Sequence, residues 1–241
     1  MGRKRSALKP LYVVEHWQLV EPDAGRQHLI NNGFDIRVVE PWRGEALPQI
    51  TGEEAGVMIM GGPQMITEAD ANHHPYLLDE LHFIEQIMAK NVPLLGVCLG
   101  SQMIAKVLGA KVGYHPNDHM AMGFYPLKAT TSDQALNLSD GMMVLNGNAQ
   151  GWDMPSGVEP LATSSEGNPF ENQAFRTDKT LALQFHPEVT RNILLQWQSD
   201  FSSSFGRIGT QSKAQLDEGF VAYDANLKAW YRCVLDEWFG D

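Results

Sequence analysis

The stretch that decides the fold of this 241-residue chain is Pro93-Leu94-Leu95-Gly96-Val97-Cys98-Leu99-Gly100-Ser101-Gln102. Its apolar residues up to Val97 predict a buried strand, and the apolar positions that follow recur at helical spacing until Gly109. Cys98 is therefore expected on a strand-to-helix turn between two glycines. This is the pattern of a nucleophile elbow, which raises the nucleophile above the carboxyl edge of a sheet.

Two physical consequences are expected for Cys98 at such a turn. The positive end of the helix macrodipole favours the thiolate form, and exposure at the turn opens the sulfur to a substrate. The alternative is that Cys98 is a small buried apolar residue, as isolated cysteines often are. The flanking Gly96 and Gly100 favour the nucleophile.

A nucleophilic thiol needs a base, and the base needs an orienting group. The stretch Leu181-Ala182-Leu183-Gln184-Phe185-His186-Pro187-Glu188-Val189-Thr190 supplies both. Its apolar residues alternate as in a strand, and Pro187 forces His186 into an extended conformation. Residues two apart in an extended chain point the same way, so Glu188 can hold the His186 imidazole while the imidazole faces Cys98. The alternative for a lone His186 is an ordinary core or surface histidine.

The remaining pattern predicts an α/β fold. Apolar runs at 11–15, 36–39 and 56–60 predict strands, and 22–32 and 77–88 have helical character. This rhythm is typical of a doubly wound, mostly parallel central sheet flanked by helices, whose ligands lie beyond the carboxyl ends of the strands. Gly61-Gly62-Pro63 falls at such an end, although two glycines and a proline also make an ordinary turn.

The second half of the chain changes character. Short extended runs between 111 and 176 predict a small antiparallel extension of the sheet. Thr190 is a good N-cap for a following helix, and 206–241 is expected to form a C-terminal helix. The aromatic-rich stripe of that helix must be covered, either by the chain's own sheet or by a partner.

Three motifs together resemble the class I (triad) glutamine amidotransferases, and most closely stand-alone members similar to the amidotransferase domain of GMP synthase. They are Gly96–Gln102, Gly61-Gly62-Pro63 and Gln184–Glu188, and the resemblance extends from about Leu11 to Thr190. It implies a flavodoxin-like fold with Cys98, His186 and Glu188 as the catalytic triad. It also implies an oxyanion hole made by the Gly62 and Leu99 amides, and substrate contacts at Gly61, Gln102, Asn146 and Gly147.

The chain departs from the family pattern at one wall of the expected pocket. Most relatives carry a His-Gly-Asp-like motif there, whereas this chain has Leu145-Asn146-Gly147-Asn148. Gly147 keeps the backbone geometry, but Asn146 and Asn148 are neutral amides in place of groups that can carry charge. Because of this departure, the sequence does not say which γ-glutamyl compound is the substrate.

The charge and cysteine content of the chain limit the kinds of partner and cofactor that are expected. A net charge of −11 argues against nucleic acid or an anionic membrane as the main partner. Two cysteines are too few for a disulfide framework, and a reactive thiol is best kept in a reducing compartment, so a cytoplasmic location is expected. No cofactor or metal is expected, since His73-His74 has no carboxylate or cysteine at a usual ligand spacing.

The length favours a single domain over 11–241, preceded by a loose basic tail over 1–10. Three functions remain open. The first is a glutaminase that releases ammonia for a separate synthetase chain, because no ATP-binding loop is evident. The second is a self-contained hydrolase of another γ-glutamyl amide, and the third is a catalytically idle binding module.

Overall fold

The computed structural model describes residues 8–67, 70, 72–130, 136 and 138–240. Within them, one sheet has the strand order β2-β1-β3-β4-β11-β10-β9-β6-β7. Its first five strands run parallel: β2 (Asp35–Val39), β1 (Pro10–Val14), β3 (Gly56–Ile59), β4 (Leu94–Val97) and β11 (Thr180–Leu183). This is the doubly wound order in which ligands bind at the carboxyl ends of the strands. The predicted α/β fold is confirmed.

An antiparallel extension completes the sheet, as the short extended runs predicted. It consists of β10 (Asn172–Arg176), β9 (Glu159–Ser164), β6 (Ala121–Ala129) and β7 (Met143–Asn148). A separate two-stranded sheet pairs β5 (Val112–Tyr114) with β8 (Gln150–Trp152). Strand β8 was not predicted, because its three residues are too few for alternation to be read from sequence.

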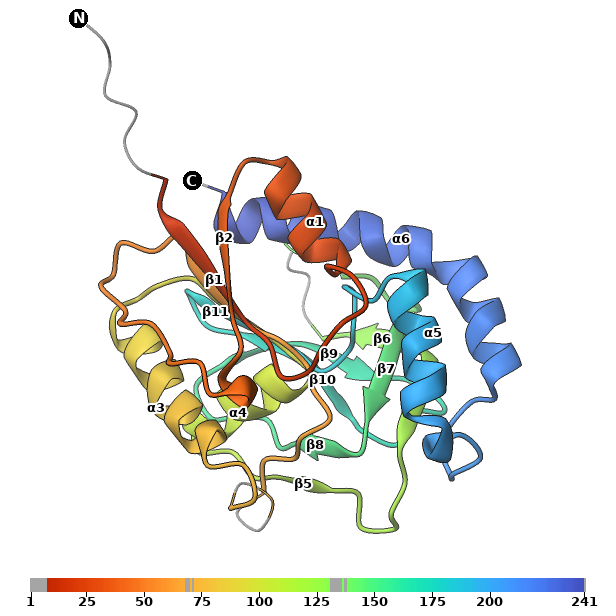
Figure 1. Cartoon of the computed structure of the whole chain (residues 1–241). Coiled ribbons are helices and arrows are strands. Elements are labelled where there is room, and N and C mark those ends of the chain that lie inside the picture. The colour runs from red at the N-terminus through yellow and green to blue at the C-terminus, as the bar shows by residue number, and fades with distance from the viewer. Residues whose placement is uncertain (1–7, 68–69, 71, 131–135, 137, 241) are drawn as a thin grey trace, which may run out of the picture.

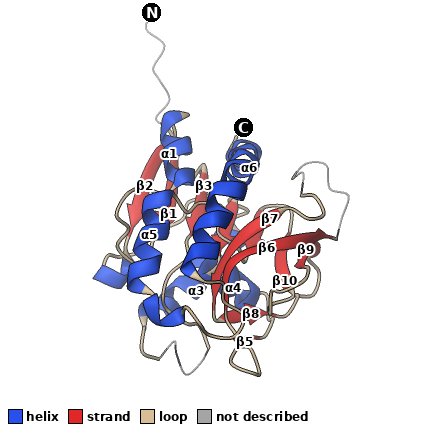
Figure 2. Cartoon of the chain, turned by 90° about the vertical axis from the view of Figure 1, so that its right-hand side faces the viewer, coloured by secondary structure: helices blue, strands red, loops and turns tan. Residues whose placement is uncertain are grey.

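Alternating side chains on the parallel strands divide the core into two layers. Val13, Met58 and Leu95 pack with α1 (Ala24–Asn31), α5 (Arg191–Asp200) and α6 (Lys213–Phe239). Val14 and Val57 pack on the opposite face with α3 (Tyr76–Ala89) and α4 (Leu99–Val107). Figure 1 shows α1 and α6 together on one face of the sheet and α3 and α4 on the other. Figure 2 shows the antiparallel strands β6, β7, β9 and β10 to the side of these helices. Two short 3₁₀ helices, η1 (Pro41–Arg43) and η2 (Ser202–Ser204), lie in connecting segments.

Capping residues fix where the helices begin. The Asp23 side chain accepts hydrogen bonds from the amides of Gly25 and Arg26 at the start of α1, and Thr190 accepts from Ile193 at the start of α5, as predicted. Ser212 and Gln215 form a capping box, so α6 begins at Lys213. Residues 206–212 of the expected C-terminal helix are therefore outside it.

The chain's own core covers only part of the apolar stripe of α6, since Tyr223 remains 37% exposed. Trp230, Tyr231 and Phe239 are buried in the same core layer as Leu95 and Leu183. Of the expected basic tail over 1–10, residues 1–7 lie outside the described part of the chain, and Pro10 already belongs to β1. No helix in the described part of the chain combines the length and apolarity needed to cross a bilayer.

Candidate active site

The turn from β4 to α4 is a tight elbow with Cys98 at its tip. Cys98 has φ 49° and ψ −104°, a left-handed backbone that is strained for a residue with a side chain. The glycines around it permit the close packing: a β-carbon at Gly96 would lie 2.7 Å from the Gly100 carbonyl carbon, and one at Gly100 would overlap the Ile59 carbonyl oxygen. The Cys98 amide donates to the Leu183 carbonyl at 2.8 Å, which ties the elbow to β11.

The thiol lies in a nearly closed environment. Cys98 is only 5% exposed, which differs from the open sulfur expected at a turn. Two segments supply the cover: the side-chain amide of Gln184, just after β11, donates to the sulfur over 3.6 Å, and the thiol lies 3.9 Å from the carbonyl oxygen of Gly147 in β7. Access to the sulfur is therefore through the cavity beside it.

The structure brings His186 and Glu188 together, as their spacing predicted. His186 Nδ1 and Glu188 Oε1 lie 2.7 Å apart, and both side chains are buried. His186 Nε2 has no hydrogen-bond partner within the described protein. Burial alone would lower the pKa of His186, but the Glu188 carboxylate and then the nearby Cys98 sulfur outweigh it and raise the pKa to about 10. The imidazole is thus held as a cation beside the thiol.

The loop after β3 lies against Cys98 and His186. A β-carbon at Gly61 would lie 2.8 Å from His186 Cε1 and 3.5 Å from Cys98 Cβ, so only glycine allows this approach. A β-carbon at Gly62 would overlap the His16 side chain. Leu99 is the first residue of α4, where backbone amides have no acceptor in their own helix.

His16, which the sequence analysis did not single out, supports this loop. Its Nε2 lies 2.8 Å from Glu80 Oε2 in a pair with both side chains fully buried, and its carbonyl accepts from Gln64 Nε2 at 2.7 Å. His16 and Glu80 are 64 residues apart in the chain, so no local sequence pattern could have revealed this pair.

The residues expected to bind substrate are placed differently from one another. Gln102 lines the cavity, and its side-chain amide donates to the Gln150 carbonyl at 3.0 Å. Gly147 also lines it, and a β-carbon there would lie 2.6 Å from the Trp197 ring. Asn146 is fully buried, does not line the cavity, and donates to Gln173 Oε1 at 3.0 Å. Of the two asparagines flanking Gly147, only Asn148 lines the cavity.

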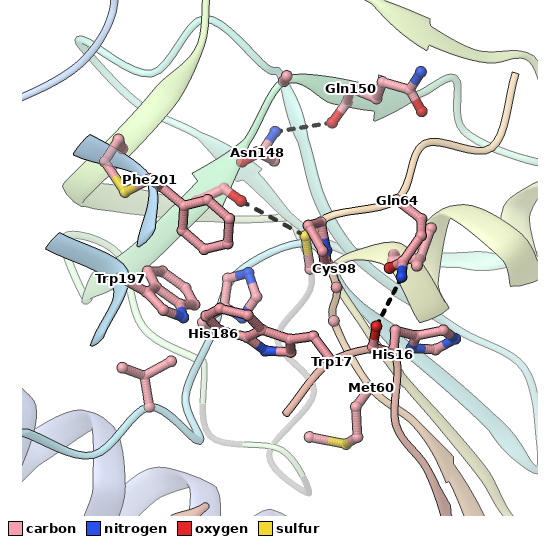
Figure 3. A pocket seen from close by; sticks show the side chains of 18 of the residues that line it. His16, Trp17, Met60, Gln64, Cys98, Asn148, Gln150, His186, Trp197 and Phe201 are labelled. Atoms are coloured by element: carbon pink, nitrogen blue, oxygen red, sulfur yellow. Dashed lines mark hydrogen bonds between the residues drawn. The ribbon is translucent and has the colours of Figure 1, made fainter. Parts of the chain in front are cut away.

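A cavity of about 150 Å³ lies over Cys98, Leu99 and His186, at the carboxyl ends of the parallel strands. Gly61 and Gly62 line it as well. Figure 3 shows the His186 ring beside the Cys98 sulfur, with Trp17, Trp197 and Phe201 on the same side as His186. The described residues contain no cluster of three or more histidine, cysteine or acidic side chains that could hold a metal ion.

A buried charged cluster lies behind Glu188. Arg26 contacts Asp23 at 2.9 Å and Glu15 at 2.7 Å. Burial raises the pKa of Glu15 to about 7, although Arg26 opposes the shift. Burial also raises the pKa of Asp23, and the Glu188 charge adds to it. Asp23 and Glu188 are thus two acids close enough to repel each other, and Arg26 partly compensates the charge of Asp23.

Comparison with known proteins agrees with this geometry. The family model for glutamine amidotransferase class-I matches residues 24–193. The chain is 30% identical over 139 residues to the glutamine-hydrolysing GMP synthase of Saccharomyces cerevisiae, an alignment that covers 57% of this chain and 24% of the yeast protein. The chain spans about a quarter of the length of the curated relatives it matches.

Solved structures share the fold. The crystal structure of a glutamine amidotransferase from Thermotoga maritima superposes with a TM-score of 0.85 at 24% identity, covering 98% of this chain and 100% of that one. A glutamine amidotransferase from Methylobacillus flagellatus gives a TM-score of 0.86 at 23% identity, covering 96% and 94%. The chain belongs to the class I glutamine amidotransferase family.

Proposed function

We propose that this chain hydrolyses the γ-amide of glutamine or of another γ-glutamyl amide, with Cys98 as nucleophile, His186 as acid and base, and Glu188 as its orienting partner. One observation carries the proposal: a strained elbow at a helix N-terminus presents a cysteine next to a histidine that is itself held by a buried carboxylate. Nucleophile, base and orienter in this order define thiol-dependent acyl transfer.

The reaction begins when the Cys98 thiolate, whose proton is held by the His186 imidazolium, attacks the γ-carbonyl carbon of the substrate. Negative charge develops on the carbonyl oxygen, and the amides of Gly62 and Leu99 are the donors proposed to stabilise it. The C–N bond then breaks, and His186 gives its proton to the departing amine. A γ-glutamyl thioester on Cys98 remains.

Hydrolysis of the thioester completes the cycle. His186, now neutral, takes a proton from a water molecule, which attacks the thioester carbonyl. Glutamate leaves, the sulfur regains its electron pair, and the imidazolium forms again beside Glu188. Gly61, Gln102 and Gly147 are proposed to contact the glutamyl part, because they line the same cavity as Cys98. Asn146 is proposed to act indirectly, through its hydrogen bond to Asn148 at 3.3 Å.

When glutamine is the substrate, the product amine is ammonia, which we propose is passed to a separate synthetase chain. The yeast relative is a glutamine-hydrolysing GMP synthase, and this chain matches only a quarter of that protein. A reducing compartment such as the cytoplasm would keep Cys98 as a free thiol.

The test measures glutamate released from glutamine and from a panel of γ-glutamyl amides. The proposal predicts release by the wild type, and none above background by Cys98→Ser. Cys233→Ser is the matched control, since Cys233 is an exposed free cysteine. No release from any substrate, with or without cell extract to supply a partner, would leave the idle binding module as the better description.

A further inference from the structure

The two sides of the cavity differ in chemistry. On the side of His186, three aromatic rings form a continuous surface: Trp197 meets the imidazole edge-on at 4.7 Å, and Phe201 lies 6.4 Å from Trp197 and 5.0 Å from Trp17. We call Trp17, Trp197 and Phe201 the aromatic wall. Figure 3 shows it on one side of Cys98, with Gln64 on the other side.

The aromatic wall is not simply part of the core. Trp17 and Phe201 are only partly buried, and both line the cavity. Trp17 comes from the segment between β1 and α1, and Phe201 from the end of α5, so two segments far apart in sequence converge on this point. Large apolar side chains that remain accessible inside a cavity are typical of a surface that binds an apolar group.

The chemistry of the triad says which part of a substrate meets this wall. His186 must protonate the leaving nitrogen, so that nitrogen lies next to the imidazole when the C–N bond breaks. Trp197 packs against the imidazole with ring centroids 4.7 Å apart, so a substituent on that nitrogen has the aromatic wall within its reach. Ammonia has no substituent, so hydrolysis of glutamine leaves the aromatic wall without a ligand.

The charges around the cavity agree with this assignment. The described lining residues include no arginine or lysine, while Glu15 and Glu188 contribute acidic groups. The one cationic group of the cavity is then the His186 imidazolium, which the reaction uses at the leaving nitrogen, so the α-carboxylate of a glutamyl group has only neutral donors left and glutamine gains little from ionic recognition. Contact between an apolar leaving group and the aromatic wall would supply binding that the glutamyl end lacks.

We propose that the preferred substrate is a γ-glutamyl amide whose amine carries an aromatic or other bulky apolar group. This rests on the proposed function. The Cys98 sulfur bonds to the γ-carbonyl carbon, the C–N bond breaks, the amine leaves with the proton from His186, and water releases glutamate from the thioester. The products are glutamate and a free aromatic or apolar amine.

The experiment compares kcat/KM for γ-glutamyl benzylamide, γ-glutamyl ethylamide and glutamine with the purified full chain. Both substituted substrates release alkyl-type amines, so the comparison isolates the size of the apolar group. We expect the benzylamide to exceed the ethylamide by at least about tenfold, in the range that an apolar pocket discriminates. A ratio at or below one overturns the proposal.

Variants locate the origin of the preference. Trp17→Ala and Phe201→Ala should each lower the benzylamide-to-ethylamide ratio several-fold, and Phe201→Leu should lower it less. Trp42→Ala is the matched control, because this tryptophan lies on η1 and does not line the cavity. If Trp17→Ala and Phe201→Ala both fold, by circular dichroism, and keep the wild-type ratio, the aromatic wall is not the binding surface.

The same data separate the two levels of the proposal. If glutamine and the ethylamide release glutamate through Cys98 but the benzylamide is not favoured, only the assignment of the leaving group fails. If none of the three substrates releases glutamate and Cys98 is never acylated, the proposed function fails with it.

Discussion

Two buried histidine–glutamate pairs lie within this one active-site region, and they differ in what they face. His186 and Glu188 are 2.7 Å apart, and His16 and Glu80 are 2.8 Å apart. Both histidines line the cavity. The His186 pair orients its free Nε2 toward a cysteine on a strained elbow, whereas His16 uses Nε2 for Glu80 and packs against Gly62.

The difference teaches that a buried histidine–carboxylate pair is not by itself a catalytic site. The Cys98 sulfur contributes to the raised pKa of His186, and of these two pairs only this one has Cys98, the proposed nucleophile, as a neighbour. The His16 pair instead joins the end of β1 to α3 and supports the glycine loop at Gly62. The His186–Glu188 pair is proposed to act in catalysis, and the His16–Glu80 pair to stabilise the glycine loop beside it.

The largest difference is expected when the same substitution is made in both pairs. His186→Gln should lower kcat/KM for any γ-glutamyl substrate at least about 10³-fold, because glutamine cannot shuttle the proton. His16→Gln should lower it by less than about tenfold, because it only loosens the support of the loop. Steady-state kinetics with folding checked by circular dichroism make the comparison. Equal losses in the two variants would mean that the pairs share one role.

The His16 pair should also contribute to the stability of the fold. His16→Ala leaves the fully buried Glu80 without its hydrogen-bond partner, and an unsatisfied buried polar group costs about 1–3 kcal/mol. His82→Ala, an exposed histidine on the same helix α3, is the control and should change the free energy of unfolding by less than about 0.5 kcal/mol. Urea denaturation measures both. A His16→Ala protein as stable as the control would show that the pair is not structural.

The pH dependence of activity should report on Glu188. Turnover needs a protonated His186, so kcat/KM should fall as pH rises through its pKa of about 10. In Glu188→Gln the main raising influence is removed and burial still lowers the pKa, so this alkaline limb should move to lower pH. The maximal rate should fall by about 10²-fold or more, because orientation is only partly kept. An alkaline limb that stays in place would separate Glu188 from the imidazole.

The raised pKa also links His186 to stability. Since its folded-state pKa lies above the ordinary value of 6.5, the stabilisation is fully present below about pH 6.5 and is lost as pH rises through about 10. Thermal unfolding of the wild type and His186→Gln at pH 6 and pH 10 should show a wild-type advantage at pH 6 that shrinks at pH 10.

The smallest effect is expected at the contact between Gly147 and the Trp197 ring. Gly147→Ala places a β-carbon 2.6 Å from the indole, and such overpacking costs about 1–3 kcal/mol. Gly113→Ala, which meets open space in β5, is the control and should stay within about 0.5 kcal/mol of wild type. Because Trp197 packs on His186, Gly147→Ala should also reduce activity. Equal stability of the two variants would show that Trp197 moves freely.

The parallel half of the fold could be predicted because its signals are local. Pro93 and the glycines around Cys98 mark the elbow, and the alternation before His186 with Pro187 after it fixes the direction of that side chain. The pairing of His186 with Glu188 follows from a spacing of two residues. These features depend on neighbours in sequence, so the sequence carries them.

The other features depend on contacts between distant segments. The low exposure of Cys98 comes from Gln184 and Gly147, which approach from two different segments of the chain. The aromatic wall forms only when Trp17 meets Phe201 across the fold, and Asn146 turns away from the cavity to meet Gln173. No periodicity or motif within a single stretch of sequence predicts such long-range contacts.

The central claim is that Cys98 is the nucleophile and is activated by the His186 pair. Intact-mass and peptide mass spectrometry after treatment with a glutamine-like chloroketone test it directly. The account predicts one adduct per chain, on Cys98, with parallel loss of activity, slower labelling in His186→Gln and unchanged labelling in His16→Gln. Loss of activity with the adduct on Cys233 and Cys98 unmodified, or full activity in Cys98→Ser, would contradict it.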